Sequence, residues 1–214
     1  MYMNEKYKIK FITEFLNNLY PQAVCELDYS HPHELLIAAR LSAQCTDARV
    51  NVVTKDLFKK YPDIESFACA DVEDIENIIK SCGLFHTKAN DIVNMCKMLL
   101  TEFDGKIPST IEKLTTLPGV GRKTANLIRG DVFGLPAVVT DTHCIRISNR
   151  LGLANSTNPL KVEKQLRKLL DRTLSNDFCH RLVLFGREIC KARNPKCEKC
   201  LLNKICSYFL SCIK

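Results

Sequence analysis

The sequence predicts an all-α protein divided into two lobes. Apolar residues recur three and four positions apart along most of the 214 residues, which is the spacing of a single helix face. Clusters of proline, glycine and aspartate separate these stripes, and only residues 137–140 are expected to be briefly extended. The sequence contains no internal repeat or low-complexity linker, which is consistent with compact helical lobes.

The predicted helices follow one another, each marked by an apolar stripe. The stripe positions are Leu35, Leu36, Ala39 and Ala43; Val50, Val53, Thr54, Leu57 and Phe58; Ile75, Ile78 and Ile79; and Ile92, Met95, Cys96 and Leu99. Turn residues separate the stripes at 61–63, 81–83, 104–105 and 107–109. The expected N-caps are Ser66, Asp71, Thr87 and Ser109.

These elements suggest a division of the chain into two lobes. We expect one lobe over residues 26–136, which includes the glycine-rich turn described below. The second lobe would combine residues 1–25 with residues 137–214. A cleft between two such lobes is where a substrate would most naturally bind.

Composition and charge indicate a soluble protein that suits an anionic partner. Apolar residues make up 46% of the chain and charged residues 26%, which is compatible with a folded core in water. The net charge of +7 suits a polyanion such as nucleic acid but does not require one. The sequence shows no signal peptide and no run of about 18 apolar residues. We therefore expect a cytoplasmic protein without a membrane partner.

A tight glycine-rich turn is predicted at 117–123, with the sequence Leu-Pro-Gly-Val-Gly-Arg-Lys. A short helix precedes the turn, and residues 122–129 begin the next helix. Gly119 and Gly121 allow backbone angles and a close approach that side chains would block. The pattern is typical of a helix-hairpin-helix, which binds a DNA phosphate through backbone amides. An ordinary corner between two helices is the alternative. The run Leu-Pro-Gly-Val-Gly followed by Arg-Lys-Thr-Ala is more specific to a helix-hairpin-helix and disfavours the ordinary corner.

Lys123 has two candidate roles. As a surface lysine it would contact a phosphate and add to the salt dependence of binding. As a nucleophile it would need to react as the neutral amine, which the positive helix end, the neighbouring Arg122 and partial desolvation favour. The residues by themselves favour the phosphate role.

Three further positions are candidates for catalysis on a nucleic acid or for contact with it. Asp141 is an expected helix N-cap, and a carboxylate held there is also placed to stabilise a cation that forms nearby. Gln44 and Leu84 are either plain surface residues or wedges, since a protein that extracts a base must fill the gap it leaves. His143 is expected to be structural.

The twelve cysteines fall into two groups. Eight are scattered through the helical stripes, as free core cysteines are in a reducing cytosol. The other four form the pattern C-x6-C-x2-C-x5-C and are Cys190, Cys197, Cys200 and Cys206. Four thiolates in one short loop are able to hold a cubane iron–sulfur cluster, and a zinc ion is the alternative. The six-residue first gap discriminates between them and favours the cluster.

Basic residues crowd the same segment. They are Arg187, Lys191, Arg193, Lys196, Lys199 and Lys204, against two glutamates. Such charges are often only a solvated face. A basic loop that a cluster ties down is more typical of a phosphate-contacting surface.

Taken together, these motifs resemble the endonuclease III family of helix-hairpin-helix DNA glycosylases and abasic lyases. The resemblance runs from about residue 35 to residue 206. It rests on Leu-Ser-Ala-Gln at 41–44, Gly-Leu at 83–84, the run from Leu117 to Ala125, Asp-Thr-His at 141–143 and the four cysteines. It implies a lobe built as a six-helix barrel beside a lobe that holds a [4Fe–4S] cluster.

The resemblance also implies roles for individual residues. Lys123 would attack C1′ of a flipped, damaged pyrimidine nucleotide, and Asp141 would assist. The resulting Schiff base would allow β-elimination, which nicks the strand 3′ to the lesion. Cys190, Cys197, Cys200 and Cys206 would be the cluster ligands. The residues expected to contact DNA are Gln44, Leu84, Lys88, Leu117, Gly119, Val120, Gly121, Arg122, Lys191 and Arg193.

The leading hypothesis is therefore a bifunctional glycosylase and lyase for oxidised pyrimidines in duplex DNA. We expect it to be a monomer that associates with the nucleoid when it acts. A non-catalytic DNA-binding module and a redox protein are the competing hypotheses. Adenine-mismatch glycosylases are similar but lack the lysine, so Lys123 distinguishes this chain from them.

Overall fold

The computed structural model describes residues 4–212 and divides into two compact units. We call Cys25–Gly134 the continuous unit, and Met1–Val24 together with Leu135–Lys214 the split unit. Helices make up both units, and no strand occurs within residues 4–212. The prediction of an all-α fold is confirmed. Residues 137–140, expected to be extended, link two helices without forming a strand.

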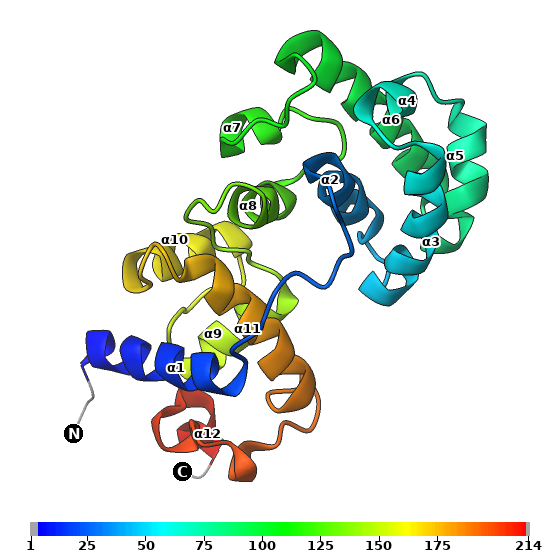
Figure 1. Cartoon of the computed structure of the whole chain (residues 1–214). Helices are drawn as coiled ribbons and strands as arrows, with labels where there is room; N and C mark the ends of the chain where they lie inside the picture. The colour runs from blue at the N-terminus through cyan, green and yellow to red at the C-terminus, as the bar shows by residue number, and fades with distance from the viewer. Residues whose placement is uncertain (1–3, 213–214) are drawn as a thin grey trace. The chain divides into compact units, whose positions relative to one another are not determined.

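The continuous unit contains seven α-helices and one 3₁₀ helix (Figure 1). They are α2 (Pro32–Leu41), α3 (Asp47–Lys60), α4 (Ile64–Ala68), α5 (Val72–Ile79), η1 (Lys80–Cys82), α6 (Phe85–Phe103), α7 (Ile111–Leu114) and α8 (Arg122–Asp131). The long helix α6 packs against α4 and α5, and α2 packs against both α3 and α8. The predicted apolar stripes point into this arrangement, because helical spacing puts their side chains on one face. Ala43 is the exception, since it follows the end of α2 and is exposed.

One hydrophobic core fills the continuous unit. Phe67 lies at its centre with no exposed surface, and its ring meets the rings of His33, Phe58 and Tyr61 at centroid distances of 5.2–6.5 Å. Edge-on and tilted contacts of this kind are favourable for aromatic rings. The core therefore ties the start of α2 to α3 and α4.

The helix starts differ in part from the predicted caps. Asp71 caps α5 as predicted, since its side chain accepts a hydrogen bond from the amide of Glu73. Asp63 rather than Ser66 caps α4, because Ser66 lies at the third helical position and completes a capping box with Asp63. Thr110 rather than Ser109 caps α7.

The start of α6 also differs from the prediction. Thr87 was expected to cap this helix but lies inside it, two positions after its first residue. Leu84 occupies the cap position in a left-handed conformation and makes no side-chain capping bond. The helix therefore begins at a strained residue.

The split unit is built around α1 (Glu5–Leu19), α9 (Thr142–Leu151), α10 (Pro159–Leu169) and α11 (Ser175–Glu188). Two 3₁₀ turns, η2 (Cys197–Lys199) and η3 (Asn203–Ile205), and α12 (Ser207–Cys212) complete it. Helix α11 packs against both α1 and α9, and α12 packs against α9. Among residues 4–212, no helix combines the length and the apolar character that crossing a bilayer needs.

Buried polar contacts join the N-terminal helix to the rest of the split unit. The Arg181 Nε donates to the carbonyl oxygen of Tyr20 at 3.2 Å, and the arginine is almost fully buried. The Tyr20 hydroxyl donates to the Glu188 Oε2 at 2.9 Å. Burial and this carboxylate raise the pKa of Tyr20. Residues 5–20 are thus anchored to α11 at their C-terminal end.

The packing of Phe67 predicts a large loss of stability when the ring is removed. Phe67→Ala should lower the free energy of unfolding by about 3–5 kcal/mol, because the cavity can close only partly. Chemical denaturation followed by circular dichroism measures this change. Val52→Ala, at a position that is 59% exposed on α3, is the control and should change stability by less than about 0.5 kcal/mol. Equal effects of the two substitutions would contradict the described core.

Candidate functional site

The glycine-rich turn joins α7 to α8 in the continuous unit. Gly119 has a φ of +73°, a conformation that favours glycine. The amide of Val120 donates to the carbonyl oxygen of Leu117 at 3.1 Å, and the amide of Leu117 donates to that of Leu114. Because both side chains are also buried, Leu117 and Val120 shape the turn from within. Their side chains therefore support the turn, and the expectation that these residues contact DNA through the hairpin backbone stays a prediction.

The first turn of α8 has the properties of an anion site. Gly121 is the N-cap residue and has no side chain to bond the first amides of the helix. Arg122 and Lys123 follow, both exposed, and the first turn contains no acidic residue. Helix N-termini favour anions, so an anion bound at this turn would be stabilised by the helix end and by the positive charge of Lys123. The start of α8 is also where the sequence predicts a phosphate contact, and it contains Gly121, Arg122 and Lys123.

An ion pair lies directly beneath this turn. The Arg40 Nε and Nη2 both donate to the Asp91 Oδ2 at 2.7 Å, and both side chains are largely buried. A Cβ on Gly119 would meet Arg40 Nε at 2.5 Å and the Asp91 Oδ2 at 2.8 Å. The absence of a side chain at residue 119 therefore lets α2 and α6 support the turn at close range.

The two predicted wedge residues share an uncommon backbone conformation. Gln44 has a φ of 56° and Leu84 a φ of 50°, both left-handed, and both residues are exposed. Leu84 leaves 55% of its surface to solvent, although it is a large apolar residue. Strained backbone at non-glycine residues concentrates at functional sites, since the surroundings must hold it in place. Both residues belong to the continuous unit.

Lys88, expected to contact DNA, is instead completely buried. Its Nζ donates to the carbonyl oxygens of Leu41 and Cys82, each at 2.8 Å. Burial lowers the pKa of Lys88, and the nearby Arg40 adds to this effect. The prediction that Lys88 contacts DNA is therefore wrong. Its buried ammonium instead joins the segment before Gln44 to the segment before Leu84.

Asp141 lies in the split unit, at the start of α9. Its Oδ1 accepts a hydrogen bond from the amide of Cys144 at 2.7 Å, which confirms the expected capping role. The residue is only partly buried. His143 lies with its Nδ1 3.2 Å from the Arg146 Nη2, in keeping with a structural role.

The four clustered cysteines line one cavity in the split unit. Phe185, Ile189, Pro195 and Phe209 contribute apolar walls to the same cavity. Burial raises the pKa of Cys197, and the neighbouring Cys190 and Cys206 raise it further, so four thiolates gathered here need cationic compensation. Within residues 4–212, no three His, Cys, Asp or Glu side chains converge as a single metal ion requires. An all-thiol donor set around a cavity with apolar walls fits an iron–sulfur cluster, and four thiolates by themselves also suit zinc.

Two arginines of α9 hold the loop that contains these cysteines. The Arg150 Nη1 donates to the Cys190 Sγ at 3.4 Å and to the carbonyl oxygen of Lys191 at 2.7 Å, and its Nη2 donates to that of Ala192 at 3.0 Å. The Arg146 Nη2 donates to the carbonyl oxygen of Cys190 at 3.0 Å. The side chains of Lys191 and Arg193 are left exposed on this fixed backbone.

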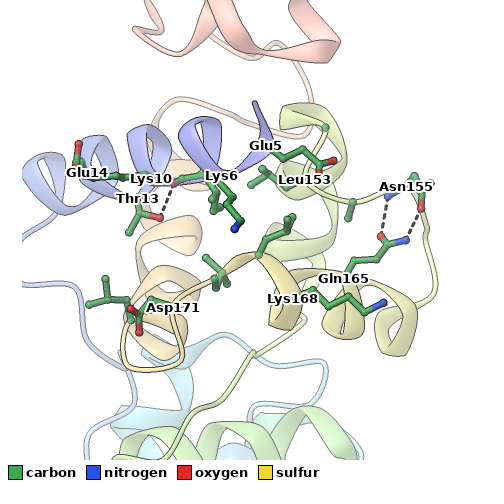
Figure 2. Close-up of a pocket in the computed structure, with 16 residues that line it drawn as sticks. Glu5, Lys6, Lys10, Thr13, Glu14, Leu153, Asn155, Gln165, Lys168 and Asp171 are labelled. Carbon is green, nitrogen blue, oxygen red and sulfur yellow. Dashed lines mark hydrogen bonds and ion pairs between the residues drawn. The ribbon is translucent and has the colours of Figure 1, made fainter. Parts of the chain in front are cut away.

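A wide cavity elsewhere in the split unit contains none of the predicted site residues. It measures about 1090 Å³ and lies between α1, the loop after α9 and the end of α10 (Figure 2). Gln165 and Asn155 close one side of it through a pair of hydrogen bonds. Its lining includes three lysines and three carboxylates, so it presents no single charge to a ligand.

Several residues that support the site carry almost no signal in the sequence. Arg40 and Asp91 are separated by 51 positions, and Arg150 and Cys190 by 40. Arg40, Asp91 and Arg150 are ordinary charged residues in helices, and nothing in the local sequence marks their partners. The one available indication was that Arg40 directly follows the fully apolar run at 35–39.

Comparison with known proteins places these features in a family. Residues 37–172 match the HhH-GPD superfamily of base excision DNA repair proteins, and residues 190–206 match the iron-sulfur binding domain of endonuclease III. Endonuclease III of Synechocystis sp. is 45% identical over 95% of this chain and 93% of its own length. Endonuclease III of Escherichia coli K12 is 38% identical over 96% of this chain and 97% of its own length.

Solved structures agree with the sequence comparison. A trapped covalent intermediate of an endonuclease III with DNA matches with a TM-score of 0.92 and 41% identity, over 99% of this chain and all of that one. A thermostable thymine-DNA glycosylase matches with a TM-score of 0.86 and 25% identity, over 96% of this chain and 98% of that one. The two-lobed helix-hairpin-helix glycosylase fold expected from the sequence is confirmed.

The turn predicts unequal effects of alanine at its two glycines. Gly119→Ala should destabilise the protein by at least about 1–2 kcal/mol, since it adds the cost of a left-handed alanine to a clash with Arg40. Gly121→Ala is the matched control, because its φ is −89° and a Cβ there meets no atom within 4 Å. Thermal unfolding of both variants measures the difference. A Gly119→Ala variant as stable as Gly121→Ala would show that Arg40 does not confine the turn.

Proposed function

Because the chain belongs to the endonuclease III family of the HhH-GPD superfamily of base excision DNA repair proteins, we propose that Lys123 and Asp141 act together on a flipped nucleotide. The protein is a bifunctional DNA glycosylase and abasic-site lyase. It removes oxidised pyrimidines from duplex DNA and nicks the strand 3′ to the site by β-elimination through a lysine Schiff base. Its cofactor is a [4Fe–4S] cluster.

The position of Lys123 carries the assignment of the nucleophile. Lys123 is exposed on the first turn of α8, two residues after the N-cap glycine. A phosphate bound at that helix start would bring a neighbouring sugar within reach of the lysine side chain. A surface lysine outside the hairpin would lack this anchor.

The chemistry of a lysine at that position follows from its amine. The neutral Nζ attacks C1′ as the C1′–N bond to the damaged base breaks, and the base leaves with its electron pair and a proton. The sugar ring then opens to give an imine between Nζ and C1′. Loss of a proton from C2′ expels the 3′ phosphate, which nicks the strand. Water finally hydrolyses the imine and releases the lysine.

Asp141 supplies the negative charge that these steps require. As the base leaves, positive charge develops on the sugar, and a fixed carboxylate stabilises it. The bond from the Cys144 amide to Oδ1 holds the carboxylate in one orientation. The other oxygen is then free to face the sugar or to take a proton from the attacking amine.

Other residues bind the DNA around the reacting nucleotide. Gln44 and Leu84 fill the gap that the flipped nucleotide leaves, because both are exposed on strained loops that project their side chains. Gly119, Gly121 and Arg122 bind the phosphate at the hairpin. Lys191 and Arg193 contact the backbone from the cysteine loop, whose exposed cations suit a polyanion.

Cys190, Cys197, Cys200 and Cys206 would hold the cluster, which supplies a rigid cross-link of the loop when bound. The hydrogen bonds from Arg146 and Arg150 to the backbone at 190–192 would then further restrain the same loop. We further propose that the protein acts as a cytoplasmic monomer, associated with the nucleoid.

Replacement of the nucleophile should abolish covalent trapping. Lys123→Ala should reduce nicking of a duplex that contains one thymine glycol by at least about a thousandfold, since no other group supplies the imine nitrogen. Borohydride trapping followed by denaturing gel electrophoresis measures the adduct. Lys113→Ala, which removes an exposed lysine from α7, is the control and should trap DNA normally. An adduct of undiminished yield with Lys123→Ala would assign the reaction to another amine.

The two functions of Asp141 are separable by substitution. Asp141→Asn should keep the helix cap and change stability by less than about 0.5 kcal/mol, because asparagine caps as well as aspartate. It should nevertheless slow base release by roughly a hundredfold or more, since the charge is lost. Asp141→Ala should lose both properties, including about 1 kcal/mol of stability. Base release by Asp141→Asn at the wild-type rate would reduce Asp141 to a cap.

A further inference from the structure

Two cysteines outside the cluster meet in the continuous unit. Cys45 directly follows Gln44 in the segment between α2 and α3, and Cys82 is the last residue of η1. The Lys88 Nζ donates to the carbonyl oxygens of Leu41 and Cys82, each at 2.8 Å, which holds the segment that leads to Cys45 beside Cys82. Cys45 is also near enough to help raise the pKa of the Cys82 thiol. The pair is therefore separate from the four cysteines of the split unit and lies beside both proposed wedge residues.

The two thiols differ in accessibility. Cys82 is 1% exposed, whereas Cys45 is partly exposed. Burial, and after it the contact with Cys45, raises the pKa of Cys82 to about 11, against the opposing effect of Lys88 and Arg49. A reagent in solution reaches Cys45 first, and the buried Cys82 reacts afterwards, with the Cys45 Sγ of the mixed disulfide.

The backbone around the pair is held in place. The buried Lys88 Nζ bonds the carbonyl oxygens of Leu41 and Cys82, so the segments that carry the two thiols are already joined by one ammonium. Gln44 and Leu84 are strained within one and two residues of the thiols, respectively. A covalent bond between the thiols would thus fix the spacing of the two wedge loops.

We propose that Cys45 and Cys82 form an oxidation-sensitive pair whose disulfide locks the Gln44 and Leu84 loops and weakens the action of the protein on damaged DNA. The oxidant is a small-molecule disulfide. The effect on DNA rests on the proposed function, because it requires both loops to adjust as they enter the duplex. The formation of the bond does not rest on it.

The reaction proceeds in two thiol–disulfide exchanges. The Cys45 thiol loses its proton and attacks one sulfur of the small disulfide, which forms a mixed disulfide and releases one small thiolate. The Cys82 thiol then loses its proton and attacks the Cys45 Sγ, which releases the second thiolate. The two thiolates take up the two protons. The protein thiols lose two electrons in total, and the small disulfide gains them.

The bond itself is tested on the cluster-loaded protein treated with oxidised glutathione. Tryptic cleavage should yield one cross-linked species that joins peptide 41–49 to peptide 81–88, with the mass of two hydrogens lost. Cys82→Ser should instead accumulate the glutathione adduct on Cys45, and Cys69→Ser, at an exposed cysteine of the same unit, should form the cross-link normally. A wild-type protein that keeps the adduct on Cys45 without closing the bond would overturn the proposal.

The consequence is tested by nicking of a thymine-glycol duplex before and after oxidation. The cross-linked protein should react about tenfold to a hundredfold more slowly, because displacement by about 1 Å near a reacting group carries a cost of this order. A thiol reductant should restore the rate, the visible absorption of the cluster should stay unchanged, and Cys45→Ser should not respond to the treatment.

The outcomes separate the two proposals. A reduced protein that nicks DNA, together with a cross-linked protein that nicks it equally fast, would overturn the lock and leave the proposed function intact. A reduced, cluster-loaded protein that neither releases the base nor nicks the strand would overturn the proposed function, and with it the claimed effect on DNA. The peptide map decides the bond in either case.

Discussion

The hairpin of the continuous unit depends on the ion pair between Arg40 and Asp91. The arginine lies in the last turn of α2, the aspartate belongs to α6, and the turn at Gly119 rests directly on both side chains. A largely buried charge is costly unless a partner and hydrogen bonds compensate it, so neither member is replaceable on its own. The pair thereby fixes the position of the turn relative to α2 and α6. It also fixes the position of the first amides of α8, which follow the turn.

A second buried cation applies the same constraint next to the hairpin. Lys88 satisfies its ammonium with two backbone carbonyls, one at the end of α2 and one at the end of η1. Buried polar groups almost always find such partners. The consequence is a common support for two exposed, strained loops that would otherwise be free to relax. Two cations in one small region thus organise the hairpin and both wedge loops.

Helix α9 has a comparable role in the split unit. Asp141 caps its first turn, and Arg146 and Arg150 reach from later turns to the backbone at 186–192. The helix therefore connects the proposed catalytic carboxylate to the loop of the cluster cysteines. Arginine suits this position because its planar group donates to several carbonyl oxygens at once. The Tyr208 ring, 4.7 Å from the Arg150 guanidinium, further limits its movement.

Local patterns in the sequence determined the fold class, the glycine hairpin, the Asp71 and Asp141 caps and the cluster cofactor. Helical periodicity, cap residues and cysteine spacing act over a few positions, so they are visible without a structure. The catalytic assignment of Lys123 and Asp141 and the four cluster ligands remain predictions. Tertiary structure alone decided that Lys88 is buried and that Leu117 and Val120 face inward. It also decided that Arg40 meets Asp91 and that Cys45 meets Cys82. These contacts join residues 37 to 51 positions apart, and such pairs form only when separate helices pack together.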